Sequence, residues 1–60
     1  MLELTLYKSA RKVLIHPDHI VGIFTDSDEG EIYTAVDTIA KQYCVAEKYN
    51  YIKSLLEQKW

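Results

Sequence analysis

The sequence predicts an α+β fold: a small antiparallel sheet of four or five strands, followed by one C-terminal helix packed on one face. Two observations carry this prediction. Short segments that alternate between apolar and polar residues fill most of the chain, and turn-forming residues separate them. The last quarter instead shows the 3–4 spacing of an amphipathic helix. At this length, we expect residues 1–60 to form a single domain.

Four extended segments are expected before that helix: residues 2–7, 12–15, 20–25 and 32–36. Leucines alternate with other residues in the first segment, and β-branched and aromatic side chains dominate the third. Gly22, inside the third segment, indicates a bulge or a close backbone approach. The acidic stretch at 26–31 is rich in turn formers, so it should connect the third and fourth segments as a hairpin.

Residues 37–46 leave two alternatives open, a strand or an N-terminal extension of the helix. A helix through this region would carry an apolar face that turns charged halfway along. A strand over residues 41–45 would instead place Tyr43 and Val45 together on one side. We favour the strand, preceded by a turn at residues 37–38.

The amphipathic helix is expected over residues 47–58, because apolar side chains recur with 3–4 spacing from Tyr49 to Leu56. Glu47 near its start and Lys59 near its end suit the helix dipole. We expect the apolar stripe of this helix to cover the apolar face of the sheet.

Charge and hydropathy limit the partners and the cellular location that we expect for this protein. The formal net charge of −2 and a pI near 5.5 argue against strong non-specific attraction to nucleic acid or an anionic membrane. No apolar run approaches the roughly 18 residues that span a bilayer, and the start of the chain lacks the apolar core of a signal peptide. We therefore expect a cytoplasmic protein with no membrane partner.

The short length favours self-association. A chain of 60 residues buries only about 60% of the surface that its unfolded form exposes, so its stability is marginal. Small domains usually add a disulfide, a structural metal or a partner subunit. Cys44 is the only cysteine, which excludes an internal disulfide, and 48% of the residues are apolar. We expect a homodimer or a higher oligomer, and no cofactor.

The segment HPDH raises the question of a metal site. Its two histidines, His16 and His19, are three residues apart, and Asp18 or Cys44 could add a ligand. Pro17, however, fixes its own φ and biases the residue before it toward an extended backbone. We interpret HPDH as a tight corner between two strands, in which Asp18 bonds backbone amides, and not as a metal site.

Little in the sequence points to catalysis. Asp26 and Asp28 match the first two ligand positions of an EF-hand calcium loop. Gly30 then falls one residue early, and Asp37 stands at the position that requires glutamate. Cys44 could pair with a histidine as a nucleophile, but its predicted strand offers no helix N-terminus to activate the thiol. We expect no enzymatic activity.

Aromatic residues crowd the second half of the chain, and Tyr and Trp are enriched at interface hot spots. Tyr43 and Tyr49 are expected in the core. The residues expected to meet a partner or a second copy are Phe24, Tyr33, Tyr51 and Trp60. An alternative surface, for nucleic acid, combines an aromatic residue with the one basic cluster: Tyr7, Lys8, Arg11 and Lys12. Three positive charges against nine acidic side chains make a solubilising hairpin tip the favoured interpretation of this cluster.

Three segments carry a resemblance to a known family: MLELTLYKS, LIHPDHIVGI and YCVAEKYNYIKSLL. On these segments the chain resembles, nearly end to end, the small FlbD-like proteins found beside flagellar motor genes and, in related forms, in phages and prophages. The central segment is similar to that family's strand–Asn-Pro-Asp-x-Ile–strand. The resemblance implies the same small fold and a non-enzymatic accessory role. Residues 37–40 replace the family's usual Asn-Gly turn, and Trp60 has no counterpart there.

A second resemblance is to the CsrA-type RNA-binding regulators, which are dimers of similar size. MLELT is similar to their opening, and AEKYNYI looks like their strand-to-helix junction. The basic residue that follows the Thr in those proteins is replaced here by Leu6, and their Gly-Val-x-Ala-Pro segment is missing. We therefore rank this resemblance below the first.

Together these observations predict a non-enzymatic interaction protein that acts as a homo-oligomer and binds an unidentified protein. The expected role is that of a phage- or bacterial-type regulator or inhibitor, for example an antagonist of a host or defence enzyme. A CsrA-like nucleic-acid-binding regulator is one alternative, although nucleic acid is the less favoured partner. A flagellar or swarming accessory protein is the other.

Overall fold

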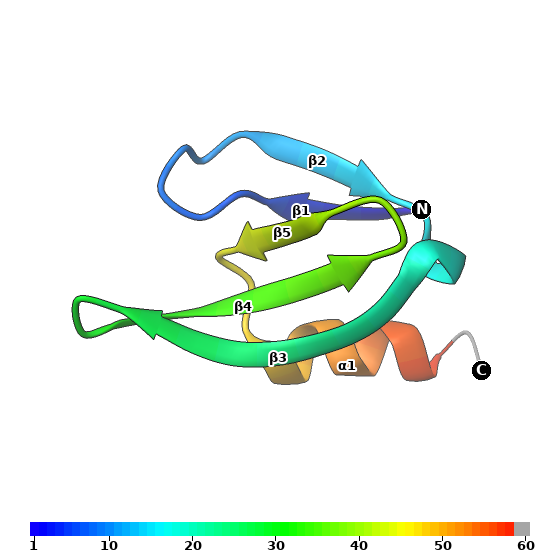
Figure 1. The fold of residues 1–60 in the computed structure, drawn as a ribbon. Coiled ribbons are helices and arrows are strands. Elements are labelled where there is room, and N and C mark those ends of the chain that lie inside the picture. The colour runs from blue at the N-terminus through cyan, green and yellow to red at the C-terminus, as the bar shows by residue number, and fades with distance from the viewer. Residues whose placement is uncertain (59–60) are drawn as a thin grey trace.

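The computed structural model of the chain describes residues 1–58, in which five antiparallel strands precede one helix (Figure 1). The elements are β1 (Leu2–Thr5), β2 (Lys12–Ile15), a 3-10 turn (Pro17–His19), β3 (Ile20–Asp28), β4 (Glu31–Thr38), β5 (Gln42–Val45) and α1 (Tyr49–Glu57). This confirms the predicted α+β class, with the helix packed against the strands.

The strands form a two-stranded sheet, β1–β2, and a three-stranded sheet in the order β3–β4–β5. An antiparallel bridge between Leu6 and Val45 joins the two sheets. Beside it, the backbone N–H of Tyr7 donates to the carbonyl oxygen of Cys44 at 2.8 Å. The five strands therefore follow one another in space as β3–β4–β5–β1–β2.

The core lies between the inner faces of the strands and the helix. Alternation in β1 turns Leu4 inward, and Ile52 of α1 meets it from the other side, so that both side chains are fully buried. The buried cluster consists of Leu4, Ile15, Val36, Val45 and Ile52. Full burial of such a side chain contributes about 1.5–3 kcal/mol, and seven partly buried apolar residues pack against the cluster.

Of the two alternatives that the sequence leaves open at Gly22, a bulge or a close backbone approach, the structure shows a bulge. The register of β3 and β4 shifts between the pair Ile20–Thr38 and the pair Gly22–Asp37, which leaves Val21 as the extra residue. Val21 is 67% exposed. The bulge lies where β3 leaves the 3-10 turn, so it bends the strand at its start.

The acidic stretch at 26–31 is mostly strand, and the prediction of a six-residue turn was too broad. The turn proper consists of Glu29 and Gly30, which have φ values of 53° and 84°. Two central residues with positive φ make a type I′ turn, which matches the twist of the flanking strands and lets pairing continue to the pair Asp28–Glu31. The hairpin is therefore longer than the sequence pattern suggests.

Strand β5 confirms the extended interpretation of residues 41–45, but the predicted turn at residues 37–38 is wrong. Strand β4 continues to Thr38, and the chain reverses after it. The Thr38 hydroxyl donates to the Lys41 carbonyl oxygen at 2.6 Å, and its oxygen accepts the Lys41 N–H at 3.0 Å. A threonine side chain thus closes this turn in place of a conventional turn former.

The helix begins at Tyr49, two residues later than predicted. Lys48 occupies the N-cap position without a side-chain cap, and no acidic residue lies in the first turn. Glu47 lies one residue before the N-cap, where its carboxylate accepts the Thr5 N–H, and Lys59 lies outside the described residues. Of the two tyrosines expected in the core, both are half-buried, and Tyr43 packs against the buried cluster.

Candidate interaction surface

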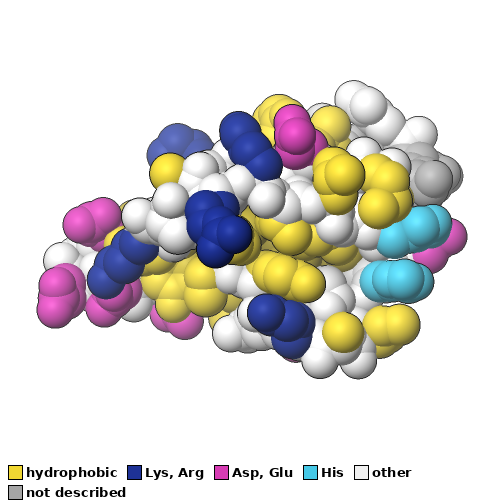
Figure 2. Space-filling model, turned by 90° about the horizontal axis from the view of Figure 1, so that it is seen from above, with side chains coloured by type: hydrophobic (Ala, Val, Ile, Leu, Met, Phe, Trp, Pro, Cys, Tyr) yellow, Lys and Arg dark blue, Asp and Glu magenta, His cyan; other side chains and the backbone are white. Residues whose placement is uncertain are grey.

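We call the outer half of the β3–β4 hairpin, residues 26–33, the acidic arm. Figure 1 shows it extending past the ends of β5 and α1, in a molecule of 34 × 19 × 17 Å. Four carboxylates lie on it: Asp26, Asp28, Glu29 and Glu31. Figure 2 shows acidic side chains gathered at this end of the molecule, while the two histidines lie at the other end. The arm also displays Ile32, which is 75% exposed.

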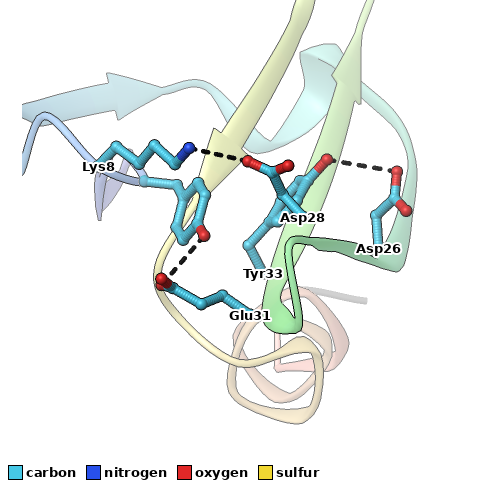
Figure 3. Close-up of polar contacts among 6 residues, drawn as sticks. Lys8, Asp26, Asp28, Glu31 and Tyr33 are labelled. Carbon is cyan, nitrogen blue, oxygen red and sulfur yellow. Dashed lines mark hydrogen bonds and ion pairs between the residues drawn. The ribbon is translucent and has the colours of Figure 1, made fainter.

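A pair of stacked tyrosines connects the arm to the loop between β1 and β2. The rings of Tyr7 and Tyr33 are 4.8 Å apart with an interplanar angle of 21°. The Tyr7 hydroxyl donates to Glu31 at 3.1 Å, and the Tyr33 hydroxyl donates to Asp26 at 3.3 Å (Figure 3). Stacking of this kind adds to the area that the rings bury, so the arm is braced from one side.

Burial raises the pKa values of both phenols, and the neighbouring carboxylates raise them further. Desolvation is the larger cause that raises the pKa of Tyr7, and the Glu31 carboxylate adds to it. Desolvation also comes first in raising the pKa of Tyr33, followed by the charge of Asp26. Both phenols therefore stay protonated, and able to donate, through the neutral range.

Lys8 provides the second link between the loop and the arm. Its ammonium nitrogen lies 2.8 Å from a carboxylate oxygen of Asp28, and this hydrogen bond raises the pKa of Lys8 (Figure 3). The loop places Lys8 and Ala10 at φ values of 73° and 60°, in the left-handed region that non-glycine residues rarely occupy. The stack and the ion pair hold the arm against a loop whose backbone is itself constrained.

The structure divides the predicted basic cluster. Tyr7 and Lys8 are tied to carboxylates of the arm, whereas Lys12 donates to the Thr5 hydroxyl at 2.9 Å and Arg11 is exposed. Tyr33 and Tyr7, assigned from the sequence to two different surfaces, lie on the same one. The acidic residues of the arm were predicted only as a solvated hairpin turn and not as interaction residues, because a run of short polar side chains is typical of such a turn.

Two hollows of about 260 Å³ flank β3 and β4. The first lies under the arm, between Thr25, Ile32 and Thr34 on one side and residues 46–50 on the other. The second is more apolar and lies between β3 and α1. Its lining residues are Ile23, Tyr49, Lys53, Leu56 and Glu57.

The HPDH segment forms the corner that the sequence predicts, but the residue that caps it differs. Nδ1 of His16 accepts the N–H of Asp18 at 3.1 Å. The His16 imidazole, and not the Asp18 carboxylate as expected, therefore accepts a backbone N–H in this corner. The ring centroids of His16 and His19 are 5.1 Å apart in a stacked arrangement, and Pro17 is buried. Within residues 1–58, no three His, Cys, Asp or Glu side chains are grouped to hold a metal ion.

The other predicted interface residues are dispersed. Phe24 is 41% exposed on the outer face of β3, opposite Ala35 of β4, while Cys44 lies opposite Ala35 on the far side. Tyr51 is 53% exposed on α1. The prediction for Trp60 falls outside the described residues.

No protein-family model, curated protein or solved structure matches this chain. The part of the chain that the structure describes has no helix both long and apolar enough to cross a bilayer.

Proposed function

We propose that this protein is a non-enzymatic interaction protein, acting as a homo-oligomer, that binds another protein through the acidic arm. Its role would be that of a phage- or bacterial-type regulator or inhibitor, such as an antagonist of a host or defence enzyme. One observation carries the proposal: a projecting hairpin with four carboxylates and the exposed Ile32 is braced by the Tyr7–Tyr33 stack and the Lys8–Asp28 ion pair.

The bracing favours binding, because a surface that is ordered before association loses less conformational freedom when the partner arrives. The arm ends in a two-residue turn, which leaves few residues to be ordered. The register pairs Asp26 with Tyr33 and Asp28 with Glu31, so these carboxylates share one face of the arm. Exposed Ile32 supplies an apolar contact on the other face, so a partner that grips the arm would meet both.

The charge of the arm defines the partner that it would fit. Asp28 is neutralised by Lys8, which leaves Asp26, Glu29 and Glu31 to face outward or to accept from tyrosine hydroxyls. Three carboxylates in a short hairpin attract a surface lined by Lys and Arg and speed encounter with it. Such surfaces bind nucleic acid in many enzymes, so occupying one would inhibit its owner.

The same charges oppose the nucleic-acid alternative. Tyr7 could stack on a base, and Arg11 is free to contact phosphate. Yet Glu31 and Asp28 lie beside Tyr7 and Lys8, where they would repel a phosphate backbone. The alternative therefore predicts binding that grows as carboxylates are removed, the opposite of the dependence proposed here.

Site-specific photo-crosslinking in a bacterial host tests the proposal. A photoreactive phenylalanine analogue replaces Ile32 on the arm, and, as the matched control, Leu14 on β2, which is also exposed. We expect a discrete protein adduct from position 32 that is lost in Asp26→Asn/Glu31→Gln. Adducts only from position 14, or adducts from position 32 that ribonuclease removes, would overturn the proposal.

A further inference from the structure

The outer edge of β3, the longest strand, is a free hydrogen-bonding edge of the sheet. This nine-residue strand pairs only with β4 in the described part of the chain, so alternate N–H and C=O groups along its other edge have no strand partner. Natural sheets blunt such edges with proline, lysine or a covering element. Residues 20–25 contain no proline and no charge, and the bulge at Val21 protects only the start of the edge.

From this edge we infer that β3 pairs antiparallel with β3 of a second copy of this chain, about a two-fold axis at Ile23. The inference deepens the proposed self-association by giving it a surface and a register. It does not depend on the partner of the acidic arm. The pairing would join the strands of both copies into one continuous sheet, with the two helices on the same side of it.

The side chains on the outer face of β3 fit this register. An axis at Ile23 places Phe24 of one copy directly opposite Gly22 of the other. Phe24 is 41% exposed, and a Cβ at Gly22 would meet no atom within 4 Å, so there is open space beside the glycine. An aromatic ring that covers a glycine on the neighbouring strand is a recurring means of stabilising edge pairs.

Charge placement selects the antiparallel orientation. Asp26 and Asp28 lie at the far end of β3, and a two-fold axis at Ile23 sends the two acidic arms to opposite ends of the dimer. Asp26 then lies opposite Ile20 of the second copy. A parallel pairing would place each aspartate beside the same aspartate of the second copy. Like charges directly opposite each other are destabilising.

The apolar hollow between β3 and α1 opens at the same edge. Ile23 and Leu56 line its middle, and Lys53 and Glu57 lie one helical turn apart on its rim. A two-fold axis reverses the order of these two charges in the second copy, so Lys53 of each copy comes to Glu57 of the other. The dimer would cover Ile23 and Leu56 and pair all four rim charges.

The first test measures mass by light scattering at micromolar concentration. We expect twice the 7.0 kDa of the monomer for the wild type and the monomer for Phe24→Lys, with unchanged circular dichroism. Leu14→Lys, on β2 at a position that is 60% exposed, is the control and should remain a dimer. A monomeric wild type, or dissociation by Leu14→Lys and not by Phe24→Lys, would overturn the inference.

The second test reads the register directly. Residues facing each other across an antiparallel pair have Cα atoms about 4.5–5.5 Å apart, which is within reach of a disulfide of about 4.4–6.8 Å. We expect Ile23→Cys/Cys44→Ser to form a covalent dimer on oxidation, and Leu14→Cys/Cys44→Ser to remain monomeric on a non-reducing gel. The converse result would place the interface elsewhere.

The third test uses the rim charges. Lys53→Glu and Glu57→Lys should each weaken the dimer about tenfold or more, and an equimolar mixture of the two variants should restore it, because every rim pair is then opposite in sign. Failure of the mixture to associate contradicts the proposed axis. Neither result alters the adduct expected at position 32, so failure of the dimer and failure of the arm are told apart.

Discussion

Glu47 and Thr5, 42 positions apart in the chain, are joined by two hydrogen bonds. The backbone N–H of Thr5 donates to both carboxylate oxygens of Glu47, at 2.9 and 3.0 Å. The Thr34 hydroxyl, buried in β4, donates to the backbone carbonyl of the same glutamate at 2.7 Å. Glu47 therefore links the two sheets at the point where the chain leaves β5 for α1.

This relationship gives the first prediction. Glu47→Gln removes the charge that strengthens the bond to Thr5, and Glu47→Ala removes the acceptor altogether. We expect the free energy of unfolding to fall by about 1–3 kcal/mol for the alanine variant and by less for the glutamine variant. Urea denaturation measures the loss. Glu3→Gln, an exposed glutamate of β1, is the control and should change little, and equal effects at the two positions would refute the role of Glu47.

The tip of the arm gives the second prediction. Glu29 occupies a left-handed conformation that Asn tolerates better, and Asn-Gly is the preferred pair for a type I′ turn. We expect Glu29→Asn to raise the free energy of unfolding by about 0.5–1 kcal/mol, and Gly30→Ala to lower it by about 1–2 kcal/mol. Thermal denaturation checks both signs. A stabilising Gly30→Ala would show that the turn has another geometry.

The tyrosine stack gives a prediction about alkaline pH. The pKa values of Tyr7 and Tyr33 lie above the ordinary 10.0, first because of burial and then because of Glu31 and Asp26. The folded state thus favours the protonated phenols, so their contribution is complete below pH 10.0 and is lost as the pH rises through the raised values. Lys8, whose pKa is also raised, contributes with the same sign.

We therefore expect the free energy of unfolding to fall above about pH 10, and to fall less steeply in Tyr7→Phe/Tyr33→Phe. Urea denaturation over a series of alkaline buffers measures the slope, and the absorbance of phenolate follows the titration. Tyr51→Phe, at an exposed position of α1, is the matched control. A slope that Tyr51→Phe reduces as much as the double variant would contradict the assignment.

The corner gives the last prediction. Nδ1 of His16 caps the 3-10 turn by accepting the Asp18 N–H, and an Asn side chain can accept the same bond. We expect His16→Ala to cost about 1 kcal/mol of unfolding free energy, and His16→Asn to restore most of it. The exposed neighbour, His19→Ala, controls for loss of the ring stack alone. Equal destabilisation by His16→Asn and His16→Ala would show that the cap contributes nothing.

Comparison with the sequence shows where local patterns were sufficient. Alternation predicted the strands, the 3–4 spacing predicted the helix, and Pro17 predicted the corner, because each signal lies within a few residues of the structure that it specifies. Boundaries were less accurate. The acidic run was predicted as a turn over its whole length. In the structure, Glu29 and Gly30 alone form the turn, and the other residues of the run belong to β3 and β4.

By itself, then, the sequence determined the fold class and the order of the elements, since these follow from periodicity and backbone preference. The structure decided between the two alternatives that the sequence left open at Gly22, in favour of a bulge at the neighbouring Val21. Only the tertiary structure decided that Tyr7 stacks on Tyr33, that Glu47 bonds Thr5 and that β3 keeps a free edge. The physical reason is that such contacts depend on which distant segments the sheets bring together. The type of a polar or aromatic residue does not specify which distant residue its side chain contacts in the fold.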